Sequence, residues 1–184
     1  MDKLEIDNIL KLKELKSELE FERATSIYGK LRWMTKDDNS LEPIRQHLKS
    51  LITQYEENHW NDESGISDEQ ITESDIAEKI VSSENKFTQK RKDLIRRKLK
   101  EAGISQQDLA KILGHRPNYM SELINGVRPF SRDDIVVLYR LFEIEFKDLV
   151  PPFLKSEVTN HIKLTLRRLK NKKVKLKIKD LETV

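Results

Sequence analysis

Apolar side chains recur at three- and four-residue steps through the first part of the chain, which is the period of an amphipathic α-helix. The apolar stripes cover residues 4–22, 24–31 and 44–55. A polar turn is expected over residues 35–40, and Pro43 then stands where the first turn of a helix tolerates proline. Residues 1–62 are therefore predicted to form an N-terminal helical bundle.

The next stretch is acidic and polar. Asn, Asp, Glu and Ser dominate residues 61–87, and no long apolar stripe continues through them. A small group of apolar residues at 76–81 predicts one weak helix. We therefore expect residues 63–87 to be an acidic linker between two folded parts.

From Thr88 onward the chain becomes basic. Lys and Arg side chains surround the apolar positions of residues 90–100 and predict a basic amphipathic helix that Gly103 ends. Four more helical segments follow down to residue 149, after which a Pro-Pro pair prevents further helix. Residues 88–154 are thus expected to form a five-helix domain.

The last thirty residues, 155–184, carry ten basic and three acidic side chains. Ile162, Leu166 and Leu169 predict a helix, and the alternation of apolar and basic residues over 174–179 predicts a short C-terminal strand. The basic side chains are suited to follow a DNA backbone, while the strand is suited to pair across a dimer or with a partner's sheet edge. Both interpretations of this tail stay open. Apart from this strand, the predicted fold class is all-α.

Composition favours two small units over one large domain. The 184 residues are 36% hydrophobic and 36% charged, whereas a typical globular chain has about 45–50% and about 25%. The formal net charge of +3 hides an asymmetry between the two halves. Residues 1–85 hold 11 basic and 20 acidic side chains, a net charge of −9, and residues 86–184 hold 24 basic and 12 acidic, a net charge of +12. A basic half of this kind is typical of contact with nucleic acid or a membrane surface.

Several classes of protein are excluded by what the sequence lacks. Because it contains no Cys, a disulfide framework, Cys-ligated zinc and thiol catalysis are ruled out. It has no apolar run of transmembrane length and begins without the apolar core of a signal peptide, so a cytoplasmic protein without membrane contact is expected. The four His residues lack metal-ligand spacing, and the acidic pair Asp133 and Asp134 is explained as the start of a helix after Ser131. We predict no catalytic residues, no metal and no cofactor.

Two short helices with clear start and stop signals follow the basic helix. Ser105, with Asp108 three residues later, has the spacing of a capping box. Gly114 suits the left-handed conformation of the turn that ends this first short helix. The second begins with Pro117 in its first turn and is stopped at Asn125 and the glycine after it. Two short helices joined by a tight glycine turn make a helix-turn-helix, whose second helix enters the major groove of DNA.

The N-terminal end of that second helix is the predicted DNA-reading surface. Asn118 is suited to adenine, Arg116 to guanine or a phosphate, and Pro117 to a thymine methyl group. Gln106 and Gln107 begin the first short helix, where side chains and backbone N–H groups meet phosphate oxygens. The remaining predicted DNA contacts are Tyr119, Ser121, Asn125 and Arg128, the last through attraction to phosphate.

Residues 94–150 resemble the Xre/Cro-type helix-turn-helix, and more closely its form in HigA-type antitoxins of bacterial toxin–antitoxin pairs. The resemblance rests on GISQQDLA (103–110), LG (113–114) and SELINGVRP (121–129), with LI (51–52) and YEENHW (55–60) upstream. It implies a homodimer that binds double-stranded operator DNA, represses its own operon and neutralises a RelE-like toxin, an endoribonuclease that cleaves mRNA. Because such toxins are small and basic, the acidic residues 1–85 are expected to attract one.

The sequence therefore predicts an antitoxin and transcriptional autorepressor. In this interpretation residues 1–62 bind the toxin or serve dimerisation, and residues 88–154 bind DNA. Two alternatives stay open. One is a stand-alone Xre-type transcriptional repressor without a toxin partner, and the other is an adaptor whose helix-turn-helix no longer binds DNA.

Overall fold

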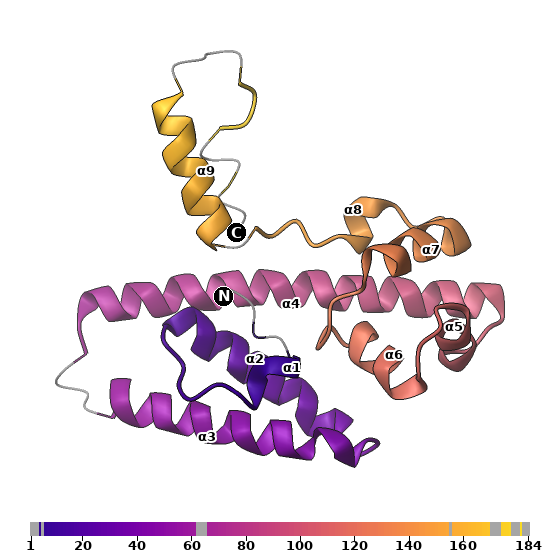
Figure 1. Ribbon diagram of the computed structural model, residues 1–184, viewed down its shortest axis with the longest axis horizontal. Helices are drawn as coiled ribbons and strands as arrows, with labels where there is room; N and C mark the ends of the chain where they lie inside the picture. The colour runs from indigo at the N-terminus through magenta and orange to yellow at the C-terminus, as the bar shows by residue number, and fades with distance from the viewer. Residues whose placement is uncertain are drawn as a thin grey trace.

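The computed structural model describes residues 4, 6–61, 66–154, 156–169, 174–177 and 181. The fold of these residues is all-α, as predicted, and none of them lies in a strand. The helices are α1 (Ile6–Ile9), α2 (Glu18–Met34), the 3-10 helix η1 (Asn39–Leu41), α3 (Glu42–His59), α4 (Asp68–Ala102), α5 (Gln106–Ile112), α6 (Pro117–Ile124), α7 (Arg132–Phe142), α8 (Phe146–Leu149) and α9 (Ser156–Arg168) (Figure 1). Within the described ranges, no helix is long and apolar enough to cross a membrane.

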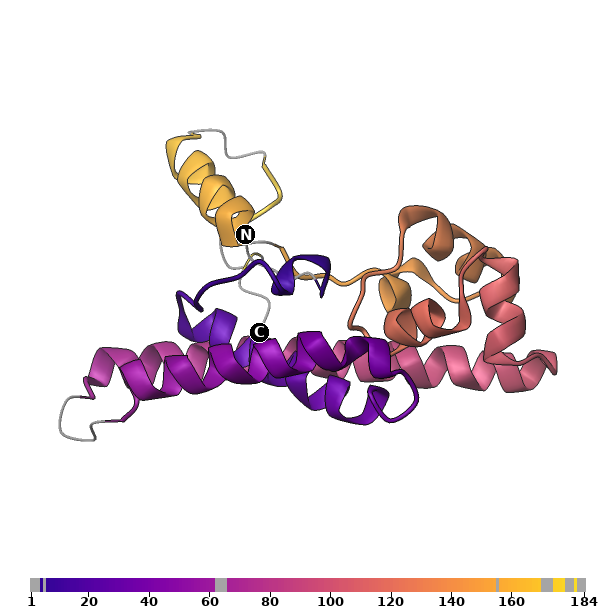
Figure 2. The same ribbon diagram turned by 60° about the horizontal axis from the view of Figure 1, so that its bottom comes forward.

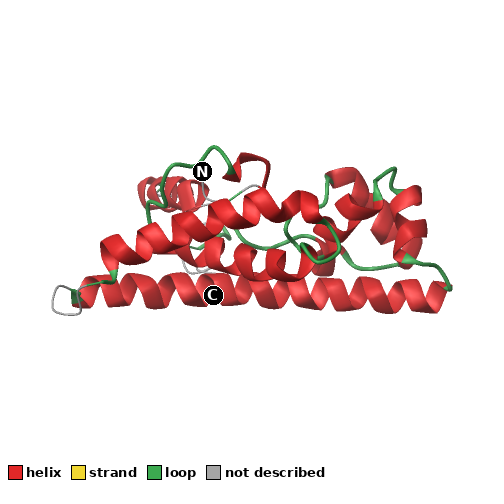
Figure 3. Ribbon diagram, turned by 90° about the horizontal axis from the view of Figure 1, so that it is seen from below, coloured by secondary structure: helices red, strands yellow, loops and turns green. Residues whose placement is uncertain are grey.

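Helix α4 is the element on which the other helices are arranged. It has 35 residues, which gives a length of about 52 Å at the usual rise per residue. The paired helices α2 and α3 lie along its N-terminal part, and α5 to α8 gather around its C-terminal end (Figures 1 and 3). In two views α9 lies apart from both groups, beyond the extended segment that follows α8 (Figures 1 and 2).

The prediction that residues 63–87 form an acidic linker is wrong from residue 68 onward. Helix α4 runs through this stretch without a break. Ser67 caps this helix by accepting a hydrogen bond from the backbone N–H of Gln70. Ala77 and Val81 are buried where α2 packs on α4. This narrow apolar stripe is enough for a helix that has a partner along its length.

Two polar contacts also hold α2 on this half of α4. Arg23 donates from Nε and Nη2 to the carboxylate of Glu84, at 3.2 and 2.6 Å. The Ser26 hydroxyl donates to Oδ1 of Asn85 at 2.9 Å. These pairs join residues about sixty positions apart, as their separations of 61 and 59 residues show. A local sequence pattern cannot reveal pairs so far apart. The sequence therefore predicted only a short, weak helix in this stretch.

The change of charge along the chain falls inside α4. Its residues 68–85 hold six acidic and one basic side chain, whereas residues 86–102 hold eight basic and two acidic. Acidic side chains near the start of a helix and basic ones near its end are both favoured by the helix dipole. One rigid helix therefore carries the acidic and the basic surface of the molecule.

The predicted helix over residues 4–22 is also wrong, because it is broken into α1 and the first turn of α2. Ser17 caps α2 by accepting a hydrogen bond from the backbone N–H of Glu20, in the Ser-x-x-Glu pattern of a capping box. Ile9 and Leu15 are nevertheless buried. The apolar residues of this stripe are thus buried by a loop that lies against α2 and α3, and not by one face of a continuous helix.

The structure has two apolar cores. The first joins α4 to α5, α6, α7 and α8, and its fully buried side chains include Ile95, Leu109, Leu123 and Leu138. The second joins α1, α2 and α3 around Ala24, Leu31 and Leu48. Val127, in the loop after α6, belongs to this second core. The N-terminal helices therefore pack against the end of the helix that was predicted to read DNA.

The C-terminal tail is confirmed only as a helix. Helix α9 contains Ile162 and Leu166 as predicted. Residues 174–177 of the predicted strand are not in a strand, and residues 178–179 lie outside the described residues.

Two glycines offer a matched test of this packing. Gly126 has a φ of +71°, and a Cβ built on it would lie 2.2 Å from Cγ2 of Thr88 on α4. Gly126→Ala is expected to lower the free energy of unfolding by more than the roughly 1–2 kcal/mol of the left-handed conformation alone. Gly29→Ala, inside α2 with nothing within 4 Å of its Cβ, should raise it by about 1 kcal/mol. Urea denaturation measures both, and equal effects would contradict the described contact.

Candidate nucleic-acid interface

The first helix of the predicted helix-turn-helix is α5, and its start is confirmed as a capping box. The Ser105 hydroxyl oxygen accepts from the backbone N–H of Asp108 at 3.2 Å, and the Ser105 backbone N–H donates to Oδ2 of Asp108 at 3.0 Å. The Ser105 hydroxyl also donates to Oδ2 of Asp108 at 2.6 Å, and this bond, together with the one from the Ser105 backbone N–H, holds the pKa of the Asp108 carboxyl below its usual range. Gly114 follows α5 with a φ of +71°, as the predicted turn requires.

The turn between α5 and α6 is tied to α7 through His115. Its Nε2 lies 2.8 Å from Oδ1 of Asp134, which is buried in the first turn of α7. The other oxygen of Asp134 accepts from the backbone N–H of Ser131, in a second capping box. The cap at Asp134 was predicted from the sequence, whereas its contact with His115 was not. Because this contact joins the turn to a third helix, it fixes where α6 begins.

The N-terminal tip of α6 is exposed, as the predicted reading surface requires. Arg116 is the N-cap residue, with no side-chain capping bond, and Pro117 is in the first turn. Asn118 and Tyr119 follow on the surface. The inward side of the same helix contains Met120, which is fully buried.

The two glutamines predicted to contact phosphate begin α5. Gln107 is exposed, and Gln106 is half-buried in the first turn. Helix α5 packs directly against α6, so both helix starts belong to one compact motif. Backbone N–H groups in the first turn of a helix point outward and have no partner within it.

Asn125 has a structural partner at the other end of α6. Its Oδ1 accepts from Nζ of Lys92 at 2.7 Å, and its Nδ2 donates to the backbone oxygen of Ser121 at 2.8 Å. Lys92 lies on α4, so this amide joins the end of α6 to the long helix. Ser121 also approaches Nδ2 through its hydroxyl oxygen at 3.3 Å.

Arg128 has a different environment from the one predicted. Its Nε donates to Oε2 of Glu122, and its Nη1 donates to Oδ2 of Asp7, each at 2.5 Å. The two carboxylates raise the pKa of Arg128, and its guanidinium lowers the pKa of Asp7. Its side chain is only 17% exposed and lies over the ring of Tyr119. These contacts favour a structural role for Arg128 over a phosphate contact.

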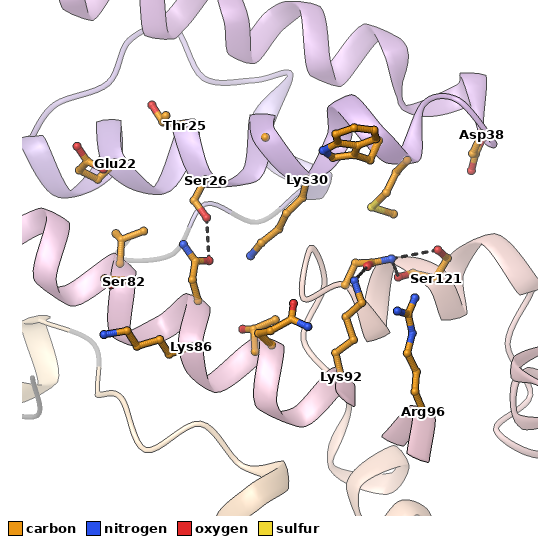
Figure 4. A pocket seen from close by; sticks show the side chains of 18 of the residues that line it. Glu22, Thr25, Ser26, Lys30, Asp38, Ser82, Lys86, Lys92, Arg96 and Ser121 are labelled. Carbon is orange, nitrogen blue, oxygen red and sulfur yellow. Dashed lines mark hydrogen bonds between the residues drawn. The ribbon is translucent and has the colours of Figure 1, made fainter. Parts of the chain in front are cut away.

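A groove of about 1030 Å³ runs between α2 and α4 and ends at α6 (Figure 4). Asn118, Ser121 and Asn125 line its α6 end. Lys92 and Arg96 come from α4 on one wall (Figure 4). The predicted reading face of α6 is therefore continuous with the basic half of α4.

The other wall of the groove is α2, which the sequence analysis did not connect with DNA. Trp33, which is 70% exposed, lines it. Nζ of Lys36 lies 4.2 Å from the centre of the Trp33 ring. Neither residue is part of a sequence motif, and only the packing of α2 on α4 brings Trp33 to this groove.

Comparison with known proteins identifies the motif. Residues 95–149 match the family model described as Helix-turn-helix. These residues are a helix-turn-helix domain. The match covers helices α5 to α8 and the last turns of α4, inside the predicted range 88–154. No curated protein and no solved structure matches the chain. The helix-turn-helix is a DNA-binding and regulatory domain, not a catalytic one.

Across the part of the chain that is described, no three His, Asp or Glu side chains are grouped so as to hold a metal ion.

Substitution of Arg128 and of Arg116 tests which of the two arginines has a structural role. Arg128→Met would leave Glu122, which is buried, without its cation, so we expect the free energy of unfolding to fall by roughly 3 kcal/mol. Arg116→Met changes an exposed N-cap residue without a side-chain capping bond, so its effect should stay within about 0.5 kcal/mol. Thermal or urea unfolding measures both. An Arg128→Met protein as stable as the wild type would contradict the structural role.

Proposed function

We propose that the chain is a transcriptional regulator that binds double-stranded operator DNA through α6. The observation that carries this proposal is the exposed polar tip of α6, held by contacts of the turn, α4 and α7 within a helix-turn-helix domain. A rigid helix with free polar side chains at its N-terminus fits the major groove. Base-edge donors and acceptors in that groove distinguish all four base pairs.

The proposed contacts divide into two kinds. Asn118 pairs with adenine, and Arg116 pairs with guanine or the adjacent phosphate. Pro117, Tyr119 and Ser121 complete the reading face of α6. Gln106 and Gln107 bind phosphate oxygens at the start of α5, and the eight basic side chains of residues 86–102 add attraction that does not depend on sequence. In this arrangement Asn125 acts through Lys92 rather than on a base.

The end of α2 extends the proposed footprint. DNA seated on α6 lies beside the groove whose other wall carries Trp33, and Lys36 lies over the ring of that Trp. An exposed indole with a Lys ammonium over it offers a cation and an aromatic face toward a phosphate backbone. We also propose that the chain binds as a homodimer, with half-sites about one helical turn apart.

We propose, as the finer function, that the protein is an antitoxin for a small basic RelE-like toxin. The acidic half of α4 supports this, because Ile71 and Ile76 are exposed there among six acidic side chains. An acidic surface with exposed apolar residues complements a basic partner. The experiment is growth rescue on co-expression with a toxin from a neighbouring gene. We expect Ile71→Asp with Ile76→Asp to lose rescue while DNA binding is kept, and unchanged rescue would contradict this surface.

The DNA proposal predicts two kinds of mutant. Using a duplex selected from a random library, Asn118→Ala and Arg116→Ala should weaken binding by roughly 5- to 150-fold, because each lost base contact is worth about 1–3 kcal/mol. Gln107→Ala should weaken all sequences about equally. Fluorescence anisotropy at several salt concentrations measures these affinities.

The control for this experiment is Arg140→Ala, which removes one exposed positive charge from the last turn of α7. It should change affinity far less than Arg116→Ala. If the Arg116 and Asn118 variants bind the selected duplex as the wild type does, α6 is not the reading helix. If no duplex is selected at all, the adaptor interpretation replaces the DNA proposal.

A further inference from the structure

A second cavity, of about 140 Å³, lies at the junction between the N-terminal helices and the helix-turn-helix domain. Its walls come from α2, α4, the loop after α6 and the segment after α8. Three aromatic rings line it, Phe87, Phe130 and Phe153, and the first and last of these meet edge to face with centroids 6.1 Å apart. The cavity is distinct from the reading face of α6, since it contains none of Arg116, Asn118 or Ser121.

Arg91 lines this cavity and is the unusual residue of the junction. It is only 5% exposed, and among the described residues no carboxylate forms an ion pair with it. Its Nη1 donates to the backbone oxygen of Leu149 at 3.2 Å, and its guanidinium lies over Phe87 and Phe130. Its Nε is buried without an acceptor in the described structure. Burial lowers the pKa of Arg91 to about 10, so the group is still charged at neutral pH.

A second guanidinium that lines the same cavity, that of Arg23, also has an N–H donor without an acceptor among the described residues. Nε and Nη2 of Arg23 are used by Glu84, but Nη1 is buried without an acceptor in the part of the chain described. Arg128, the third arginine of the lining, is already paired with Glu122 and Asp7. The two unused donors therefore belong to residues of two packed helices, α2 and α4, and both residues line the cavity.

Buried cations are normally paired, and buried N–H groups normally have an acceptor. Cation–π contacts and one carbonyl satisfy Arg91 in part, but they leave its charge without an anion. The same walls offer apolar surface from Ile27 and the aromatic rings. An occupant that satisfies both features has one negative charge and a compact apolar body.

We propose that this cavity binds a small organic carboxylate, whose oxygens accept from Nε of Arg91 and Nη1 of Arg23 while its apolar body contacts the phenylalanine rings. An apolar cavity of about 150 Å³ accommodates benzene, so this cavity of about 140 Å³ has room for a compact apolar body, from which the carboxylate extends toward the two guanidinium groups. Since Thr88, Gly126 and Arg128 also line the cavity, the occupant touches both the N-terminal helices and the helix-turn-helix domain. The cavity is thus an effector site at the junction of the two parts.

The test uses the full chain and three probes in calorimetric titrations at constant ionic strength. Sodium benzoate carries the ring and the charge, benzamide carries the ring without the charge, and inorganic phosphate carries charge without the ring. We expect saturable binding of benzoate at one site per chain. Benzamide should bind roughly ten- to a hundredfold more weakly, the range expected for a hydrogen bond to a charged group, and phosphate more weakly still. Equal affinity for benzoate and benzamide, stronger binding of phosphate, or no saturable benzoate binding would overturn the proposal.

Three variants locate the site. Arg91→Met replaces an unpaired buried charge by an apolar side chain of similar length, a change that proteins usually tolerate. Arg23→Lys keeps a cation beside Glu84 but removes Nη1. Both should lower benzoate affinity by roughly tenfold or more. The matched control is Arg97→Met on the same helix, where the side chain is 66% exposed, and it should bind benzoate as the wild type does. If both cavity variants retain wild-type affinity, the proposed site is wrong; if Arg91→Met does not fold, Arg23→Lys alone decides. Because no DNA is present, this outcome is independent of the function proposed above.

Discussion

Helix α4 packs its acidic N-terminal half against α2 and contributes its basic C-terminal half to the core of the helix-turn-helix domain. Because one unbroken helix does both, the position of the N-terminal helices relative to α6 is set by helix geometry instead of by a flexible connection. The contacts of Val127 with the N-terminal core and of Arg128 with Asp7 reinforce this at the other side of the junction. The groove beside α6 and the smaller cavity behind it both result from this arrangement.

The residues around α6 divide according to what holds them. His115, Glu122, Asn125 and Arg128 are each engaged by a neighbour, namely Asp134, Arg128, Lys92 and the carboxylates of Asp7 and Glu122. Arg116 and Asn118 at the tip of α6 are exposed. Side chains that are already paired at a motif's base give it a fixed shape, and exposed ones at its tip remain available to a ligand. This division is the physical basis for assigning base contacts to the tip alone.

Much of the C-terminal half was predictable because its signals are local. Ser105 with Asp108, Gly114 and Pro117 each act within a few residues, and the structure places each in its predicted position. The N-terminal half was predicted less well. The acidic stretch is helical because Ala77 and Val81 are buried where it packs on α2, and because Arg23 and Ser26 pair with Glu84 and Asn85 across about sixty residues of sequence. Likewise, the ion pair of Arg128 with Asp7 could not be predicted, because the two residues lie 121 positions apart in the sequence. The α2 wall of the groove was not predicted for the same reason, since only tertiary packing brings Trp33 there.

The account depends on α6 occupying the major groove, with its tip against base edges. Methylation interference with dimethyl sulfate on a selected duplex tests this directly, because guanine N7 lies in the major groove and adenine N3 in the minor groove. The account predicts that methylation of guanine N7 blocks binding in two clusters about one helical turn apart. Interference confined to adenine N3, or none at any purine while binding persists, would contradict it.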